Sequence, residues 1–245
     1  MKQVQGVLAF DFDDTLITNV PEETILRWCA KFTEPGDLPK PSMYMKDIVD
    51  YQNDVFSLVF KKGKTIQDIL NQVDFKYMSP GMIPLIEEVR SRLGFKIMIV
   101  TDNNSVVLEH SLKSLGVAHL IDEIVVNPAK INPQGQLVVS PWQIQDHCPL
   151  SFRNLCKGQA LFEYVEKLEK NSGRKVDFVG YCGDNRNDVC PALRLRAGDI
   201  VFPRAGHPLV QFLEDKQSEM KADIVPWSTG QDILNAIDAK LKTLS

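Results

Sequence analysis

The sequence predicts an α/β fold in which a doubly wound parallel sheet lies between two layers of helices. Short apolar runs alternate with amphipathic segments, and each run is apolar at every position, as in strands that helices cover on both faces. The predicted strands are residues 7–10, 95–103, 122–127, 176–184 and 199–203. The stretch NPQGQ at residues 132–136 predicts a hairpin turn.

Amphipathic helices are predicted between these strands because apolar side chains recur there at helical spacing. Gly94 and Gly116 follow the first two apolar stripes, where a glycine can end a helix in the left-handed conformation. We interpret the stripes as core packing, so that strands and helices alternate as a parallel sheet requires. The stripes are Met82, Leu85, Ile86, Val89 and Leu93; Leu108, Leu112 and Leu115; and Ala160, Leu161, Tyr164, Val165 and Leu168.

A second, smaller unit is predicted where this alternation stops, at residues 17–77. Two helical patterns occupy this segment, with Thr65 as the N-cap of the second and a Pro-rich loop at 34–42 between them. We therefore predict a helical cap, residues 17–77, inserted into an α/β core formed by residues 1–16 and 78–245. The two patterns comprise Ile25, Trp28, Cys29 and Phe32, and Ile66, Ile69, Leu70 and Val73.

The composition restricts the partners of the chain. With 245 residues and a net charge of -4, the chain lacks the basic footprint that a phosphate backbone needs, so we expect no nucleic acid partner. No apolar run approaches the ~20 residues of a membrane span, and Asp11 interrupts the first run before it could act as a signal peptide. Five cysteines without paired spacing indicate reduced thiols. We therefore expect a cytoplasmic protein without a membrane partner.

A cluster of acids follows the first predicted strand in the stretch GVLAFDFDDTLI, where Asp11, Asp13 and Asp14 lie close together. Clustered carboxylates repel one another, and burying them is costly unless a cation or a proton joins them. In open α/β sheets, ligands bind beyond the carboxyl ends of the strands, so polar residues at other strand ends are expected to meet this cluster. These residues are Thr101, Asp102 and Asn103, and Asp184, Asn187 and Asp188.

Oxygen ligands from several loops suit Mg²⁺, which takes a few carboxylates and keeps waters and substrate oxygens. An EF-hand is excluded, because its sixth position requires glycine and counting from Asp11 places Leu16 there. The sequence also lacks a GxxxxGK[ST] phosphate loop, a GxSxG elbow and an HExxH helix. Lys157 alone would be interpreted as a solvated helix lysine. Its position between the second and fourth strands favours a role in offsetting phosphoryl charge.

Four motifs in this order resemble those of the haloacid dehalogenase superfamily of phosphatases: DxDxT at 11–15, Thr101, the isolated Lys157 and GDNRND at 183–188. A closer resemblance covers nearly the whole chain. The stretches DFDDTLI, SPGM, VTDNN, NLCKG, GDNRNDVCPAL, GDIVFPRAGHPL and ADIVPW are similar to the phosphoethanolamine/phosphocholine phosphatase and pyridoxal phosphate phosphatase family. This resemblance implies a Rossmann-like core of the haloacid dehalogenase type with an inserted cap. It also implies a Mg²⁺-dependent phosphomonoesterase.

The resemblance assigns a role to each residue of the expected site. Asp11 would attack the phosphorus atom and form an aspartyl-phosphate, which water then hydrolyses. Asp13 would protonate the leaving alkoxide and later deprotonate the water. Thr101 and Lys157 would hold the phosphoryl oxygens. The Mg²⁺ ion would be bound by Asp11, Asp184 and the backbone carbonyl of Asp13, with Asp188 supporting the metal shell.

Asp102 is not needed for phosphoryl transfer, and the resemblance implies that it contacts the cationic head of the substrate. Glu22 in the cap matches a second acid, with Glu in place of the usual Asp. Such a pair would select amine-bearing phosphomonoesters such as phosphoethanolamine, phosphocholine or pyridoxal 5′-phosphate. The alternatives stay open: Asp102 as a charge at a helix N-terminus and Glu22 as a surface residue. Asn103 and Asn104 either contact the substrate or cap the following helix.

Three residues near the expected site depart from the family pattern. Asn185 and Arg186 replace Gly and Ala of the usual GDGAND, and Ser151 stands where a middle cysteine is usual before the lysine. These departures leave the substrate preference open. No zinc site is predicted in this run, because the spacing matches no common pattern and a fourth ligand is absent; the candidates would be His147, Cys148 and Cys156.

The expected function is a Mg²⁺-dependent phosphatase for a small amine-bearing or cofactor phosphate, acting as a monomer or a homodimer. A phosphatase for another small phosphate, such as thiamine phosphate, pyrophosphate or phosphoserine, is an alternative. An alternative of another class is a non-catalytic regulator that binds Mg²⁺ or a phospho-ligand. The presence of Asp13 argues against that regulator, because binding alone does not need a proton donor.

Overall fold

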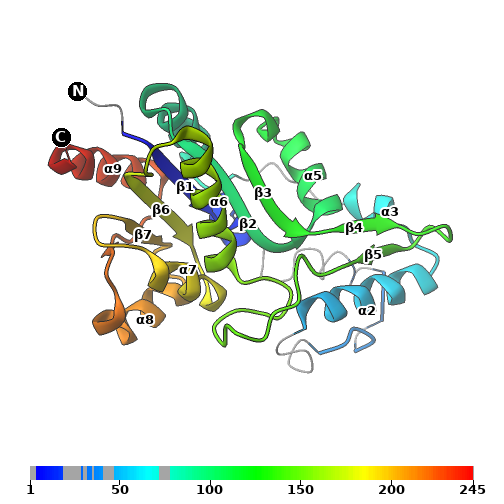
Figure 1. Ribbon diagram of the computed structural model, residues 1–245. Coiled ribbons are helices and arrows are strands. Elements are labelled where there is room, and N and C mark those ends of the chain that lie inside the picture. Colours follow the sequence, from blue (N-terminus) through cyan, green and yellow to red (C-terminus); the bar gives the residue numbers. More distant parts are fainter. Residues whose placement is uncertain are drawn as a thin grey trace.

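The computed structural model describes residues 4–18, 29, 32–34, 36–40, 47–71 and 78–244 (Figure 1). Its centre is a parallel sheet with the strand order β3-β2-β1-β6-β7-β8. These strands are β1 (Gly6–Phe10), β2 (Lys96–Asn104), β3 (Glu123–Asn127), β6 (Phe178–Gly183), β7 (Ile200–Pro203) and β8 (Asp223–Ile224). The five predicted strands are confirmed, and the short edge strand β8 is added to them.

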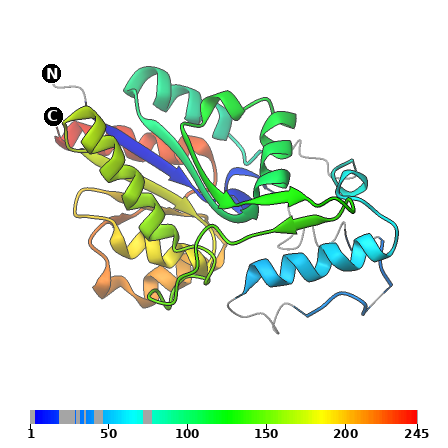
Figure 2. The same ribbon diagram turned by 45° about the vertical axis from the view of Figure 1, so that its right-hand side comes forward.

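Helices cover both faces of the sheet, so the predicted three-layer α/β fold is confirmed (Figure 2). Side chains alternate across β1: Val7 and Ala9 pack into one apolar cluster, Leu8 and Phe10 into the other. The first cluster includes residues of α6 (Lys157–Ser172), α7 (Val189–Arg194) and α8 (Pro208–Asp215). The second includes residues of α4 (Met82–Glu88), α5 (Ser105–Ser114) and α9 (Gly230–Leu244).

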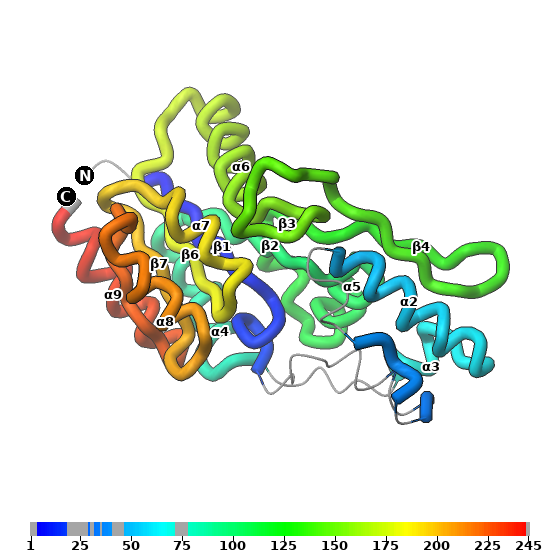
Figure 3. Tube along the Cα trace, turned by 90° about the horizontal axis from the view of Figure 1, so that it is seen from below, coloured from blue at the N-terminus to red at the C-terminus, as the bar shows by residue number. Residues whose placement is uncertain are grey.

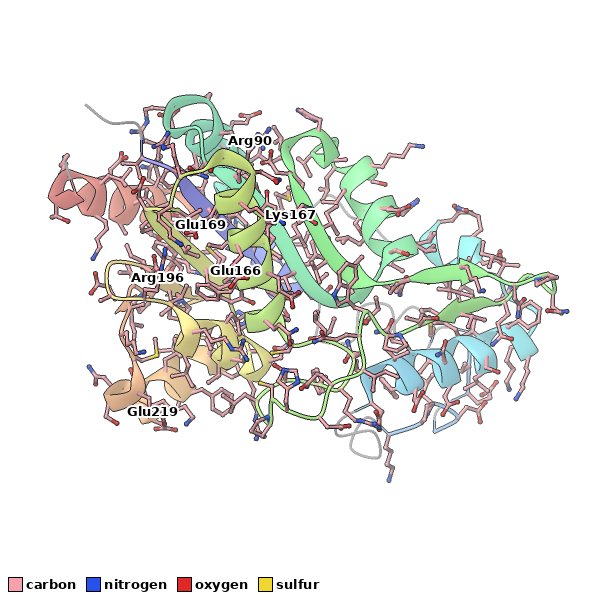
Figure 4. The ribbon with its side chains drawn as sticks, viewed as in Figure 1. Arg90, Glu166, Lys167, Glu169, Arg196 and Glu219 are labelled. Atoms are coloured by element: carbon pink, nitrogen blue, oxygen red, sulfur yellow. The ribbon has the colours of Figure 1, made fainter. Side chains whose placement is uncertain are left out.

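Helices α4, α5 and α6 follow the three predicted apolar stripes, and the first two of these helical segments end at the predicted glycines. After α4 the chain continues in a further helical turn, Val89–Leu93, and Gly94 and Gly116 adopt the left-handed conformation, with φ of 69° and 71°. The polar face of α6 points outward, as the exposed side chains of Glu166 and Lys167 show (Figure 4). In the part of the chain that the structure describes, no helix has the length and apolar character needed to cross a membrane.

The predicted cap segment contains α2 (Ile48–Lys61) and α3 (Ile66–Leu70), and Thr65 caps α3 in a capping box with Asp68. The predicted hairpin turn joins β4 (Ala129–Ile131) to β5 (Leu137–Val139), and this hairpin runs beside α2 (Figure 3). Side chains of α2, α3 and β5 share one apolar cluster. A hairpin from the later part of the chain therefore packs against the two helices of the predicted cap. Ile25, Trp28 and Val73 of the two predicted patterns lie outside the described residues.

The sheet topology brings the expected site residues to one edge. From β1 the chain extends the sheet through β2 and β3 on one side and through β6, β7 and β8 on the other, so the strand order reverses at β1. Phe10, the last residue of β1, pairs with Ile99 and with Cys182. The residues that follow these positions therefore leave the sheet side by side at the edge where α/β proteins bind ligands.

Candidate active site

Asp11 and Asp13 leave the carboxyl end of β1 in a tight turn. The backbone N–H of Asp11 still donates to the carbonyl of Cys182 at 2.9 Å, and the chain then enters the distorted helical turn Phe12–Leu16. Asp14 adopts the left-handed conformation, with φ of 53°, and its carbonyl accepts a 2.6 Å hydrogen bond from Arg204 Nη1. Asp14 is thus the residue at which this turn reverses, and short polar side chains tolerate that conformation.

Lys157 reaches the cluster from the first residue of α6. Its Nζ donates to Asp11 Oδ1 at 2.7 Å and to Asp188 Oδ1 at 2.9 Å, and the side chain is only 1% exposed. The interpretation of Lys157 as a solvated helix lysine is therefore wrong. The lysine is a buried cation between two carboxylates, and such a group is tolerated in a protein interior only when opposite charges surround it.

The carboxylate of Asp188 accepts four hydrogen bonds. Its Oδ1 accepts from Lys157 and, at 2.6 Å, from Tyr181 Oη, while its Oδ2 accepts from the backbone N–H groups of Asp184 and Asn185 at 3.0 and 3.1 Å. Gly183 makes this approach feasible, because a Cβ atom there would lie 2.6 Å from the Asp188 carboxylate. Both oxygens of Asp188 thus accept hydrogen bonds from the protein, and these bonds hold Lys157 and the loop after β6 in place.

The carboxylate of Asp184 has a different environment from that of Asp188. Its Oδ2 lies 3.4 Å from Nδ1 of His207, the residue before α8. Burial raises the pKa of Asp184, and the charges of Asp11 and Asp188 raise it further. Burial likewise raises the pKa of Asp11, and Lys157 opposes this effect. Each of these carboxylates therefore gains a proton readily unless another cation compensates its charge.

The cluster has the donor set of a hard divalent cation. Oxygen atoms of Asp11, Asp184 and Asp188 lie within 4.8 Å of one another, and all three residues are buried. With Asp13 close by, the carboxylates outnumber the single ammonium of Lys157. Oxygen ligands and excess negative charge fit a divalent metal such as Mg²⁺. Because both oxygens of Asp188 already accept hydrogen bonds, Asp11 and Asp184 are the better placed of the three as direct ligands.

Thr101 and Asn103 lie where β2 becomes irregular, since its register against β3 shifts between Val100 and Asn104. Thr101 is buried, and its Oγ1 accepts from the backbone N–H of Asn103 at 3.2 Å. Asn103 Nδ2 donates to Asp13 Oδ2 at 3.1 Å. The pKa of Asp13 is raised to about 6, because burial raises it by more than the hydrogen bond from Asn103 lowers it. The structure therefore brings Asn103 to Asp13. The cap of the following helix is Asn104.

Asn104 is that cap, since its side chain accepts from Val107 N at the start of α5. Its Nδ2 also donates to Gln52 Oε1 at 3.1 Å, and Gln52 Nε2 donates to the carbonyl of Asp102 at 3.0 Å. One glutamine of α2 thus binds two residues at the end of β2, Asp102 and Asn104. The sequence gives no signal for this contact, because it joins segments 50 residues apart.

Asp102 faces the interior of the site. Its Oδ1 accepts from Asn154 Nδ2 at 2.8 Å and its Oδ2 from Asn187 Nδ2 at 2.9 Å. Lys157 Nζ lies 4.0 Å from Oδ2. Two amides and a cation therefore fix the orientation of this carboxylate. Glu22, the predicted second acid, lies outside the described residues.

The family described as "Putative Phosphatase" matches residues 6–241 of the chain. The chain belongs to this phosphatase family. A phosphoethanolamine/phosphocholine phosphatase of Homo sapiens is 29% identical to it over 97% of this chain and 90% of that protein. A pyridoxal phosphate phosphatase, PHOSPHO2, of Homo sapiens is 29% identical over 96% and 98%. Inorganic pyrophosphatase 2 of Arabidopsis thaliana is 29% identical over 93% and 80%.

A solved structure has the same fold as this phosphatase. A phosphoserine phosphatase, described as a phospho-aspartyl intermediate analogue, matches with a TM-score of 0.59 and 19% identity over 95% of this chain and 99% of that one. At that identity the likeness shows the fold alone. Family and fold together confirm the resemblance predicted from the sequence: the protein is a phosphatase with a haloacid dehalogenase-type fold.

Proposed function

We propose that this phosphatase is a Mg²⁺-dependent phosphomonoesterase that works through an aspartyl-phosphate at Asp11. The observation that carries the proposal is the buried contact of Asp11 with Lys157, beside a second acid, Asp13, that has its own hydrogen-bond partner. A purely structural metal site needs carboxylates but neither a buried lysine nor a proton donor. Phosphoryl transfer needs a nucleophile, a cation for the phosphoryl oxygens and an acid for the leaving group.

In the first half-reaction a carboxylate oxygen of Asp11 attacks the phosphorus atom in line with the leaving oxygen. The new O–P bond forms as the bond to the leaving alkoxide breaks, and Asp13 gives its proton to that alkoxide. The raised pKa of Asp13, about 6, keeps a fraction of this acid protonated near neutral pH. In the second half-reaction Asp13 takes a proton from water, which attacks the aspartyl-phosphate and releases phosphate and free Asp11.

Thr101 and Lys157 bind the phosphoryl group in this proposal. Lys157 Nζ already contacts the nucleophile, so a phosphoryl group on Asp11 would lie within reach of its ammonium. Asp188 and Tyr181 position that ammonium. Mg²⁺, held by Asp11, Asp184 and the backbone carbonyl of Asp13, would supply further positive charge to the phosphoryl oxygens. Asp188 supports this metal site through its hydrogen bonds to the backbone N–H groups of Asp184 and Asn185.

We propose an amine-bearing or cofactor phosphate as the substrate. The names of two relatives, a phosphoethanolamine/phosphocholine phosphatase and a pyridoxal phosphate phosphatase, support this class. Asp102 is the residue that would face the cationic group, with Glu22 as its predicted partner. Since Asn154 and Asn187 hold both oxygens of Asp102, an ammonium would meet a carboxylate of fixed orientation.

A phosphatase for another small phosphate is the second candidate. The relative named inorganic pyrophosphatase 2 favours pyrophosphate among these alternatives, which also include thiamine phosphate and phosphoserine. The contact of Lys157 with Asp102 is relevant here, because part of the Asp102 charge is already compensated within the protein. Asp102 would thus repel a fully anionic substrate less strongly than a carboxylate without a cation beside it would. The partners we propose are small molecules alone, and a cytoplasmic monomer or homodimer remains our prediction.

Phosphate release from a panel of small phosphomonoesters and pyrophosphate tests this function. The panel is run with Mg²⁺ and with a chelator, using the wild type and Asp102→Asn. We expect release that requires Mg²⁺ and is greatest on phosphoethanolamine, phosphocholine or pyridoxal 5′-phosphate, with Asp102→Asn losing selectivity for these substrates. Greatest release on pyrophosphate would leave the mechanism intact and remove the ammonium-recognition role of Asp102. No release on any substrate would instead favour the non-catalytic regulator.

A further inference from the structure

Three cysteine thiols meet where the start of α6 packs against α7. The Sγ atom of Cys190 lies 3.4 Å from that of Cys148 and 3.6 Å from that of Cys156, and all three residues are buried. They come from three segments: the loop before α6, the N-cap of α6 and the first turn of α7. The sequence spacing predicts no zinc motif because the third thiol is contributed by Cys190, far along the chain from the other two.

The packing of α6 on α7 permits this convergence. A Cβ atom at Gly158 would lie 2.8 Å from Cys190 Sγ and 2.8 Å from Arg194 Cδ. Only a residue without a side chain therefore lets the start of α6 approach α7 so closely. Arg194 Nη2 in turn lies 3.6 Å from Cys156 Sγ, which places a positive charge beside the three thiols.

The distances fit a metal better than a disulfide. The S–S bond of a disulfide is about 2.05 Å long, and a disulfide between two of these cysteines would leave the third thiol unpaired. Thiolates that bind one Zn²⁺ tetrahedrally at about 2.3 Å lie about 3.8 Å apart. The separations of 3.4 and 3.6 Å are close to that value. Ser151 Oγ lies 3.4 Å from Cys148 Sγ and is an oxygen donor available for a fourth position.

We propose that Cys148, Cys156 and Cys190 bind a structural Zn²⁺ ion that is distinct from the carboxylate metal site. Thiolate sulfur is a ligand for Zn²⁺ and not for Mg²⁺, so the thiol site and the carboxylate site select different metals. Binding releases the thiol protons, because zinc binds the thiolate form. Three thiolates and one Zn²⁺ carry a net charge of about -1, which Arg194 offsets.

The position of this zinc site gives it a consequence for catalysis. Cys156 precedes Lys157, and Cys190 follows Asp188 by two residues. A metal bond across α6 and α7 therefore ties together the two segments whose side chains meet at 2.9 Å in the active site. Loss of zinc would loosen that contact without removing any residue that touches the substrate.

Cobalt substitution of the wild-type protein tests the proposal without any variant. The reduced protein is stripped of metal, reloaded with one equivalent of Co²⁺ in the presence of excess Mg²⁺, and its absorption spectrum is recorded. We expect thiolate-to-cobalt charge-transfer bands and the strong visible bands of tetrahedral cobalt, and their displacement by Zn²⁺. Cobalt bound only by the carboxylates would show weak visible absorption without charge transfer, and that spectrum would overturn the proposal.

Zinc content of variants gives the second measurement. Cys148→Ser and Cys190→Ser remove one ligand each, and Cys29→Ser is the matched control because Cys29 is a buried thiol outside the cluster. We expect about one Zn²⁺ per chain in the wild type and in Cys29→Ser, and at least about tenfold weaker binding in the other two. If reduced wild-type protein retains no zinc and binds none on titration, the proposal is wrong.

Discussion

Lys157 Nζ lies 2.7 Å from Asp11 Oδ1 and 2.9 Å from Asp188 Oδ1, so one buried ammonium joins the end of β1 to the loop after β6. These two segments meet at the reversal of strand order, where the sheet is open to a ligand. The lysine thus compensates the charge of both carboxylates, and we propose that it also binds the phosphoryl group during the reaction. Because Lys157 is the first residue of α6, the geometry of the site depends on the position of this helix.

Replacement of Lys157 by Met is expected to lower kcat/KM roughly 10²- to 10³-fold, the usual effect of removing one donor that stabilises transition-state charge. It is also expected to lower the free energy of unfolding by about 3 kcal/mol, because it leaves buried carboxylates without their partner. Steady-state kinetics and urea unfolding measure the two effects.

Lys167→Met is the matched control for this change. Lys167 lies on the outward face of α6 (Figure 4), is 58% exposed and pairs with Glu123 on the surface. Both kcat/KM and stability are expected to stay close to wild type, since exposed ion pairs contribute about 0–1 kcal/mol. Equal effects of the two substitutions would show that the buried contact has no special role.

Asn103 is expected to set the pH dependence of the reaction through Asp13. Burial raises the pKa of Asp13, and the Asn103 amide N–H, which stabilises the ionised carboxylate, lowers it; the net result is a pKa raised to about 6. Asp13 must be protonated to serve the leaving group, so kcat/KM falls as pH rises through this pKa. In Asn103→Ala the alkaline limb should move to higher pH, by roughly half a unit to one unit.

The pH profile of kcat/KM, measured with Mg²⁺ at saturating concentration, checks this shift. Asn235→Ala, an exposed asparagine on α9, serves as the control and should leave the profile in place. An alkaline limb that does not move, or that moves to lower pH, would show that Asp13 is not the acid whose protonation limits the reaction.

Gln52 is expected to couple the cap to the catalytic core. It donates to the Asp102 carbonyl and accepts from Asn104, so both ends of its amide are used. In Gln52→Glu a carboxylate cannot donate to the carbonyl, and KM for the preferred substrate should rise several-fold, by about 1 kcal/mol of lost binding. Asn53→Ala is the comparison, because Asn53 joins α2 to Val139 of the hairpin and not to the site. If KM is unchanged in Gln52→Glu, the contact of Gln52 with the end of β2 does not contribute to substrate binding.

Much of the core site is predictable because its residues lie at strand ends. Asp11 and Asp184 follow continuous apolar runs, and parallel strands bring their carboxyl ends to one edge whatever the loops do. Lys157 is predictable only through its place in the order of motifs, since its spacing resembles that of any helix lysine. The structure brings it into the cluster because α6 begins directly beneath the ends of β1 and β6 (Figure 1).

The remaining contacts depend on residues far apart in the sequence, and no local pattern marks them. Asn187 reaches Asp102 across 85 positions and Asn154 reaches it across 52, both through amides common in loops. Tyr181 has the pattern of an ordinary core residue, although its hydroxyl serves Asp188. Helix α2 is hard to predict because it contains β-branched residues of low helix propensity. It is stabilised by packing on the hairpin β4–β5.

We propose that Asp11 carries the phosphoryl group during turnover. The most direct measurement is to quench the enzyme during steady-state turnover, reduce it with borohydride and map the modified residue by peptide mass spectrometry. Borohydride converts an aspartyl-phosphate to homoserine, so we expect homoserine at position 11 in the wild type and none in Asp11→Asn. Phosphate release by Asp11→Asn at the wild-type rate, or a modified residue at another position, would show that Asp11 is not the nucleophile.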